Sequence, residues 1–145
     1  MIYKTDPRNN TMIQEYGCYW FSIFWFIEQA GLATFDDPVA IEALYQDHLA
    51  KGWIDNECTV LNGEAIFASY GLKVKLLKVQ GDFKLPPSFV ASEGDFEIQS
   101  WTWKYTHFVP AVNELVAWDS IQPPGSYSIK NGKLDSKRIY RPVAA

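Results

Sequence analysis

One cysteine near the N-terminus stands where a chemically reactive thiol would be expected. Cys18 lies at the start of a dense apolar run, residues 16–27, which predicts a buried helix. The partial positive charge at a helix N-terminus stabilises a thiolate, so a cysteine placed there has a lowered pKa and is a better nucleophile. A thiol nucleophile also needs a base that takes its proton and a third group that orients the base.

His107 and Asp119 are the candidates for the base and the orienting carboxylate. His107 opens a predicted strand, 107–112, and Asp119 follows the next one, 115–118, twelve residues after the histidine. Two antiparallel strands joined by a tight turn bring their outer ends side by side. A carboxylate in that position can accept the second ring N–H of the imidazole and fix its tautomer. The spacing therefore predicts contact between His107 and Asp119.

Structural roles compete with catalytic ones for these residue types. Cysteine is among the most buried residues, so Cys18 within an aromatic run could simply pack in the core. Cys58 has no comparable partner and His48 lies within a predicted helix, so both are interpreted as structural. A metal site built from the two cysteines and two histidines is disfavoured, because no pair has a ligand spacing such as C-x2-C or H-x3-H.

The elements that must position these residues are helices in the first half and strands in the second. Helices are predicted over 17–31, 38–51 and 63–70. Strands are predicted over 72–76, 96–103, 107–112, 115–118 and 138–141, and the Asn-Gly pair within 127–134 indicates a hairpin. This order predicts an α+β fold with an antiparallel sheet.

Length and composition indicate one globular domain, residues 1–145. The chain is 48% hydrophobic and 21% charged, and a core of this size needs no metal or disulfide. Two cysteines exclude a disulfide framework; one bridge stays open, although free thiols are favoured.

Charge and hydropathy argue against two classes of partner. The net charge is −4, which disfavours nucleic-acid binding, and the one local basic cluster is read as the solvated face of a strand: Lys73, Lys75 and Lys78. The apolar run 16–27 is too short to span a bilayer, which takes about 20 residues. Because the N-terminus also lacks the pattern of a signal peptide, we expect a cytoplasmic location with no membrane partner.

The order of the candidate residues resembles that of the papain-like cysteine peptidases. A cysteine opening an apolar helix, then His-Phe-Val at a strand start, then an aspartate ending the next strand, is similar to a compact bacterial branch of that superfamily. This branch includes the double-glycine leader peptidase-like proteins, and the resemblance covers most of the chain, from Gln14 to Asp119. It implies a papain-like fold, with Cys18 at the start of a central helix packed on a C-terminal antiparallel sheet. It also implies no cofactor and a peptide or protein substrate.

The resemblance assigns a role to each candidate residue. Cys18 would be the nucleophile, His107 the base and then the acid, and Asp119 the orienting carboxylate. Papain-like enzymes also carry a glutamine upstream of the cysteine that donates to the oxyanion. Six residues before Cys18 stands Met12, and the glutamine of this chain, Gln14, lies four before it. Gln14 is therefore the candidate side-chain donor, and the backbone N–H of Cys18 is a second one.

Three hypotheses about function follow. The first is a thiol hydrolase that cleaves a peptide, isopeptide or related amide bond through an acyl-enzyme. The second is a catalytically idle papain-like scaffold that binds a partner, which Tyr19 and the displaced Gln14 favour because they would crowd or misbuild the oxyanion site. The third is a glycan-binding module that uses Trp101 and Trp103. Both tryptophans and Tyr19 are also candidate walls of a substrate groove, although packing within the sheet is the simpler interpretation of the tryptophans.

Overall fold

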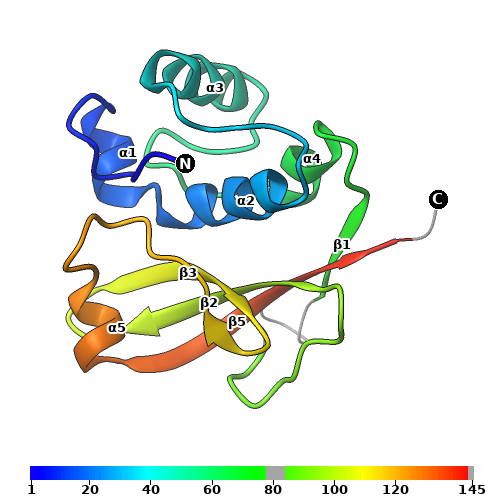
Figure 1. Cartoon of the computed structure of the whole chain (residues 1–145). Coiled ribbons are helices and arrows are strands. Elements are labelled where there is room, and N and C mark those ends of the chain that lie inside the picture. The colour runs from blue at the N-terminus through cyan, green and yellow to red at the C-terminus, as the bar shows by residue number, and fades with distance from the viewer. Residues whose placement is uncertain (78–83, 144–145) are drawn as a thin grey trace.

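The computed structural model describes residues 1–77 and 84–143. In chain order the elements are α1 (Thr11–Tyr16), α2 (Cys18–Gln29), α3 (Pro38–Ala50), α4 (Gly63–Ala68), β1 (Val74–Leu77), β2 (Phe96–Thr102), β3 (Thr106–Val112), β4 (Leu115–Val116), α5 (Tyr127–Asn131) and β5 (Lys133–Pro142). Figure 1 shows a helical layer, built from α1 to α4, above the sheet, with α5 at one end of the strands. The expected α+β fold is confirmed. Lys78 of the predicted basic cluster lies outside the described residues.

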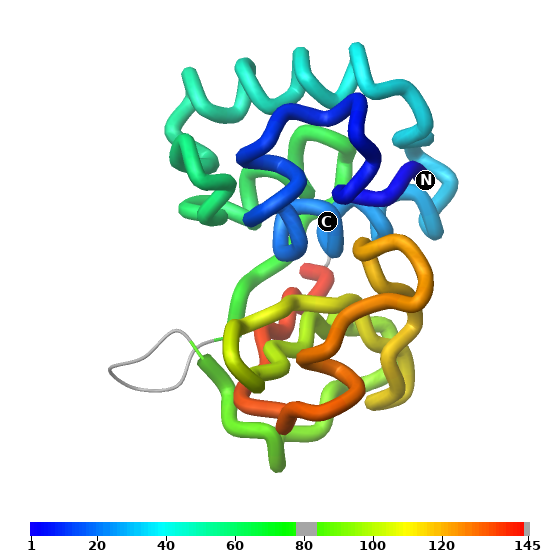
Figure 2. The backbone as a smooth tube through the Cα atoms, turned by 90° about the vertical axis from the view of Figure 1, so that its left-hand side faces the viewer, coloured from blue at the N-terminus to red at the C-terminus, as the bar shows by residue number. Residues whose placement is uncertain are grey.

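The helix α2 is the centre of the structure. Its side chains are buried around nearly the whole circumference, and five apolar ones are 0% exposed: Trp20, Phe21, Ile23, Phe24 and Ile27. A helix that is apolar on all sides must be covered on all sides. Accordingly, α3 lies on one side of α2 and the sheet lies on the other, in both views (Figures 1 and 2). No helix among the described residues is long and apolar enough to cross a membrane.

The five strands form one sheet in the order β1-β5-β2-β3-β4, and all neighbouring strands are antiparallel. Its helix-facing side packs through aromatic rings, for example Phe96 against Phe26 of α2, at 5.0 Å between ring centroids. Asn113 and Glu114 join β3 to β4 with φ values of 51° and 68°, which is the geometry of a tight two-residue turn. The predicted turn is therefore present, although β4 is only two residues long, shorter than the predicted 115–118.

The predicted hairpin at residues 127–134 is wrong. The segment instead forms the helix α5, whose N-cap Ser126 accepts a hydrogen bond from the N–H of Ser128 at 3.1 Å. Gly132 ends this helix at a point where the chain passes close to β2. A side chain has no room there, because a Cβ at this position would lie 2.4 Å from the carbonyl oxygen of Thr102. The Asn-Gly pair therefore marks a helix end, and β5 begins directly after it rather than at residue 138.

A short helix that the sequence pattern does not predict, α1, ends at Tyr16, two residues before Cys18. Its N-cap Asn10 accepts from the N–H of Ile13 at 2.9 Å, and Gly17 separates it from α2 with φ −77° and ψ 4°. A Cβ on Gly17 would lie 2.6 Å from the carbonyl oxygen of Ile13. The break between the two helices therefore depends on glycine, and it makes Cys18 the first residue of a new helix rather than a mid-helix residue.

We expect Gly17→Ala to destabilise the protein. The added methyl group would meet a main-chain oxygen that cannot move away without distorting α1, and overpacking of this kind costs about 1–3 kcal/mol. The midpoint of urea unfolding measures the change. Val39→Ala, which trims an exposed side chain of α3 (77% exposed), is the control and should leave the midpoint unchanged. Equal stability of Gly17→Ala and the unsubstituted protein would contradict the role given to Gly17.

Candidate active site

The structure brings Cys18, His107 and Asp119 together. Cys18 is the first residue of α2, His107 is the second residue of β3, and Asp119 follows β4. The imidazole Nε2 of His107 lies 2.8 Å from Oδ1 of Asp119, so the predicted contact between them is confirmed. The Cys18 thiol lies near enough to the same imidazole for each group to move the pKa of the other toward its charged form. Because Nε2 is bound to the carboxylate, Nδ1 is the ring nitrogen left to face the thiol.

The carboxylate of Asp119 is held in place by the loop that follows it. Oδ1 also accepts from the N–H of Ile121 at 2.9 Å, and Oδ2 accepts from the N–H of Ser126 at 2.8 Å. Gly125 has φ 87°, and a Cβ there would lie 3.2 Å from Oδ2. Burial alone would raise the pKa of Asp119, but these hydrogen bonds, that from His107 above all, hold it below its usual range. The carboxylate is thus ionised and fixed toward the imidazole.

Electrostatics favour an ion pair between the thiol and the imidazole. Burial opposes a charge on His107, but the hydrogen bonds to Asp119 and to Cys18 raise its pKa to about 9. Burial likewise opposes a charge on Cys18, but His107, the N–H of Phe108 and the ammonium group of Lys4 bring the pKa of the thiol below its usual value. At neutral pH these directions favour a thiolate beside an imidazolium. This state is the one in which a cysteine is nucleophilic and a proton donor is ready.

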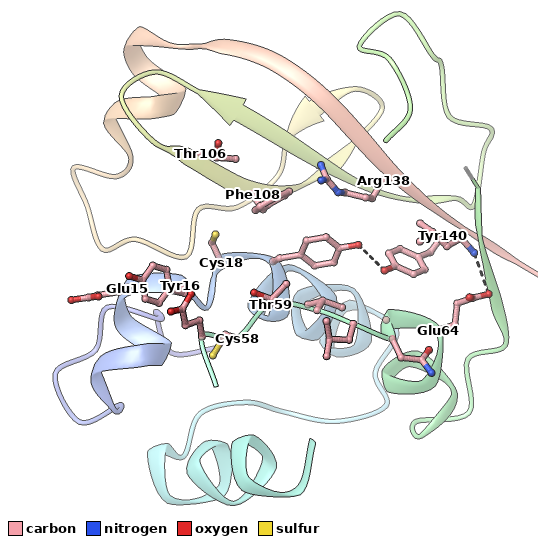
Figure 3. Close-up of a pocket in the computed structure, with 17 residues that line it drawn as sticks. Glu15, Tyr16, Cys18, Cys58, Thr59, Glu64, Thr106, Phe108, Arg138 and Tyr140 are labelled. Carbon is pink, nitrogen blue, oxygen red and sulfur yellow. Dashed lines mark hydrogen bonds between the residues drawn. The ribbon is translucent and has the colours of Figure 1, made fainter. Parts of the chain in front are cut away.

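A groove of about 560 Å³ opens beside the thiol, between the helical layer and the sheet (Figure 3). Cys18 lies at one end of it with Glu15 and Tyr16, and Glu64 and Tyr140 lie at the other end. The middle of the groove is aromatic. The rings of Tyr19 and Phe108 are 5.0 Å apart between centroids, and the guanidinium group of Arg138 lies 4.6 Å from the Phe108 ring.

The phenol groups of Tyr19 and Tyr140 hydrogen-bond to each other at 2.7 Å. Burial raises the pKa of both phenols, so both stay neutral. The close approach of Gly63 makes room for this pair, because a Cβ on Gly63 would lie 2.1 Å from the Tyr140 hydroxyl. Of the predicted groove residues, Tyr19 therefore does line the groove, and its hydroxyl is held by the sheet.

The structure does not bring Trp101 and Trp103 to this groove. Trp101 is the cross-strand partner of His107 in the β2–β3 register, and its indole N–H donates to the side-chain oxygen of Gln99 at 3.0 Å. Trp103 follows β2 and is 41% exposed, with its ring 6.3 Å from that of Tyr105. The two tryptophans differ in their surroundings, because Trp101 is a residue of β2 within the sheet and Trp103 lies in the turn that follows this strand. The glycan hypothesis thus retains one exposed indole rather than two.

Gln14 is not among the residues that line the groove. Its side-chain amide donates to the backbone carbonyl of Asn9 at 2.6 Å, on the side of α1 where the chain enters the helix. Cys18, in contrast, keeps the backbone N–H that the sequence predicts as an oxyanion donor, because the first N–H groups of a helix have no intrahelical acceptor. The predicted side-chain donor is therefore turned toward Asn9, and the backbone N–H of Cys18 stays a prediction.

The remaining cysteine and histidine have the buried positions expected of structural residues. His48 is 1% exposed and its Nδ1 accepts from the indole N–H of Trp20 at 3.0 Å; burial lowers the pKa of His48 to about 4. Cys58 is 1% exposed, and burial raises its pKa to about 12. Within residues 1–77 and 84–143, no group of three or more His, Cys, Asp or Glu side chains could hold a metal ion.

Sequence reasoning missed most of the groove. Its wall opposite the sheet comes from the segment 57–64, and its far end comes from β5 through Arg138 and Tyr140. Neither segment carries a local pattern that distinguishes it from an ordinary loop or strand. Phe108 is the exception, since it directly follows His107 in sequence and must lie near any site that the histidine serves.

Comparison with known proteins gives a family but no activity. A family model described as "Protein of unknown function, DUF261" matches residues 1–142. The chain belongs to this family. The DUF261 match includes Cys18, His107 and Asp119. No curated protein and no solved structure matches the chain.

The two cysteines of this DUF261 protein should differ strongly in their reaction with iodoacetamide. Cys18 has a lowered thiol pKa, so its alkylation rate should rise with pH well below pH 8.5, near which an ordinary thiol ionises. Cys58, with a pKa of about 12, should stay unreacted up to pH 9. Mass spectrometry of peptides from samples quenched between pH 5 and pH 9 measures both rates in one experiment.

His107→Ala provides the decisive comparison for that measurement. Without the imidazole, burial is the dominant influence on the pKa of the Cys18 thiol and raises it, so alkylation of Cys18 should require a higher pH. His48→Ala is the matched control, since this histidine lies in the core against Trp20. If Cys18 titrates as an ordinary thiol in the unsubstituted protein, or if His107→Ala leaves its profile unchanged, the thiol–imidazole pair is not activated.

Proposed function

We propose that this protein is a papain-like thiol hydrolase that cleaves a peptide, isopeptide or related amide bond. The observation that carries the proposal is the meeting of three groups at one end of an open groove. The Cys18 thiol lies at a helix N-terminus, His107 contacts it, and Asp119 binds the far ring nitrogen at 2.8 Å. Nucleophile, base and orienting group in mutual contact are the parts that covalent acyl transfer requires.

The architecture supports the papain-like part of the proposal. The nucleophile begins the buried central helix, and the histidine comes from an antiparallel sheet packed on that helix. The groove lies between these two layers (Figure 3). A substrate in the groove would therefore contact the helical layer with one edge and the sheet with the other, with its carbonyl carbon near the thiol.

In the first half of the proposed reaction, the Cys18 thiolate attacks the carbonyl carbon of the substrate. A C–S bond forms, and the carbonyl π electrons move to the oxygen, where the N–H of Cys18 at the start of α2 donates to the oxyanion. His107, as imidazolium, then gives its proton to the amine nitrogen. The C–N bond breaks, the amine leaves, and an acyl-enzyme thioester remains on Cys18.

In the second half, water replaces the amine. Neutral His107 takes a proton from a water molecule as its oxygen attacks the thioester carbon. The C–S bond breaks, the acid product leaves, and the proton stays on His107, which restores the thiolate–imidazolium pair. Asp119 holds the ring in the same orientation through both halves, because its two oxygens remain fixed by the N–H groups of Ile121 and Ser126.

One observation favours a second function, that of a papain-like scaffold that binds a partner without cleaving it. The Gln14 amide donates to Asn9 and does not line the groove, so a side-chain donor to the oxyanion is missing from this arrangement. Loss of one such donor typically costs about 10²–10³ in rate. A penalty of that size slows a hydrolase without abolishing it, which is why the hydrolase remains the first proposal.

Incubation with a proteome-derived peptide library should reveal cleavage that depends on Cys18. New N-termini, identified by mass spectrometry, should appear with the unsubstituted protein and be absent with Cys18→Ala. Asp119→Ala should lower the cleavage rate by roughly 10²–10⁴, because the imidazole loses its orienting partner. Asp47→Ala, which removes an exposed carboxylate of α3 that pairs with Lys51, is the control for the charge change. Cleavage that persists in Cys18→Ala would refute the proposed nucleophile.

The aromatic groove should favour substrates with a large apolar side chain on the acyl side of the scissile bond. Peptidyl chloromethyl ketones that carry such a side chain should label Cys18 faster than those with glycine in its place. Leu61 lines the groove and is 60% exposed, so Leu61→Ala should cost about 1 kcal/mol of binding, roughly a fivefold slower labelling rate. Leu32→Ala, 47% exposed and outside the groove, should leave the rate unchanged. Equal labelling by all probes would exclude this selectivity.

A further inference from the structure

We infer that Lys4 is a positioning residue for the Cys18 thiolate. Its buried ammonium group binds the end of α1 that precedes the nucleophile's helix, and from there its positive charge acts on the thiolate. This inference rests on the proposed function only in taking Cys18 to be the nucleophile. The reaction sequence above does not use Lys4, and Lys4 is not among the residues that line the groove.

The burial of Lys4 is unusual for a lysine. The residue is 4% exposed, whereas lysine is almost never fully buried unless its charge is paired. Its ammonium group donates to the backbone carbonyls of Gln14 and Glu15, the latter at 3.5 Å. Across the part of the chain that the structure describes, no carboxylate lies within ion-pair distance of it. Backbone carbonyls accept hydrogen bonds from an ammonium group but carry no net charge, so they do not neutralise it.

The carbonyls that Lys4 binds belong to the last turn of α1. The last carbonyls of a helix have no intrahelical donor and carry its negative dipole end. Because α1 ends at the residue before Gly17, this negative end points toward the start of α2, where the thiolate must form. The Lys4 ammonium group donates to two of these carbonyls and offsets part of their negative partial charge, which reduces the effect of this helix end on the thiolate at the start of α2.

The backbone of Lys4 connects this turn to the carboxylate side of the site. Its N–H donates to the carbonyl of Ser120 at 2.9 Å, and its own carbonyl accepts from the side-chain amide of Asn9 at 3.2 Å. Ser120 directly follows Asp119 in sequence. One residue therefore contacts both the segment that leads to the nucleophile and the segment that follows the carboxylate.

The charges around Lys4 agree with an electrostatic role. Burial lowers the pKa of its ammonium group, and the groups that oppose this effect are, in order, Cys18, Asp119, Cys58 and Glu15. Cys18 is thus the strongest charge partner of Lys4, and Lys4 in return helps to lower the pKa of the thiol, after His107 and Phe108. Of these groups, Cys58 stays neutral because of its raised pKa.

The test is the pH profile of Cys18 alkylation in Lys4→Met, which keeps the length and apolar character of the stem and removes the charge. We expect the profile to move up by about one pH unit, so that Cys18 reacts about fivefold more slowly at its former midpoint and about tenfold more slowly well below it. Lys75→Met, an exposed position in β1, removes the same charge far from the α1–α2 junction and should leave the profile unchanged. An unshifted profile in folded Lys4→Met would overturn the inference.

A second measurement uses the unsubstituted protein and so does not depend on the variant folding. Coupling between two charges is reciprocal, so blocking the thiolate with iodoacetamide must lower the pKa of Lys4 if the two groups interact. The titration of the Lys4 Cε resonance by NMR, before and after alkylation of Cys18, reports this change. An identical Lys4 titration in both samples would overturn the electrostatic role.

The same experiments separate this inference from the proposed function. If Cys18 alkylation depends on Lys4 but no peptide is cleaved, the electrostatic role holds and the hydrolase proposal fails. If peptides are cleaved through Cys18 and Lys4→Met changes neither the alkylation profile nor the cleavage rate, the hydrolase proposal holds and the role of Lys4 is refuted.

Discussion

The burial of α2 is the constraint on which the rest of the structure depends. Because this helix is apolar around its whole circumference, α3 has to cover one side and the sheet the other. The helix is held in place by rings packed along its length, such as Phe24 against Phe35 at 4.3 Å between centroids. The thiol at that N-terminus is therefore held by the core itself, while the histidine and the aspartate are supplied by the sheet that the core requires.

Because Cys18 has a fixed position, the sheet must hold its histidine in a matching position and orientation. His107 must reach Cys18 from β3, and its ring orientation is set at the far nitrogen by Asp119. The loop from 119 to 126 fixes the carboxylate through backbone groups, since two N–H donors bind it and Gly125 leaves room for it. Fixed donors hold an ionised carboxylate more firmly than a flexible side chain would, because they lose little entropy when they bind.

The sequence allowed prediction where a residue's role follows from its neighbours along the chain. The helix α2 and the β3–β4 turn, with the meeting of His107 and Asp119, were predictable because periodicity and strand length determine them. The helix α1 and the Gly17 break were not, because a six-residue helix has too few positions to show a period. The Asn-Gly pair at 131–132 misled for a tertiary reason: Gly132 is required by the nearby Thr102 carbonyl, not by a hairpin. Contacts such as Lys4 with the end of α1 have no sequence pattern.

The buried charges of the site form an alternating series, and this order explains how so many ionisable groups can share one interior. Asp119 is negative, His107 positive, Cys18 negative and Lys4 positive. Neighbouring groups move the pKa of Asp119, His107 and Cys18 toward the charged form against the effect of burial, whereas for Lys4 they offset only part of the effect of burial, which lowers its pKa. An isolated buried charge would be neutralised by a pKa shift, as Cys58 and His48 are. The charge of the thiolate therefore depends on all four groups. Its reactivity is set jointly by residues from the N-terminal segment, α2, β3 and the loop after β4.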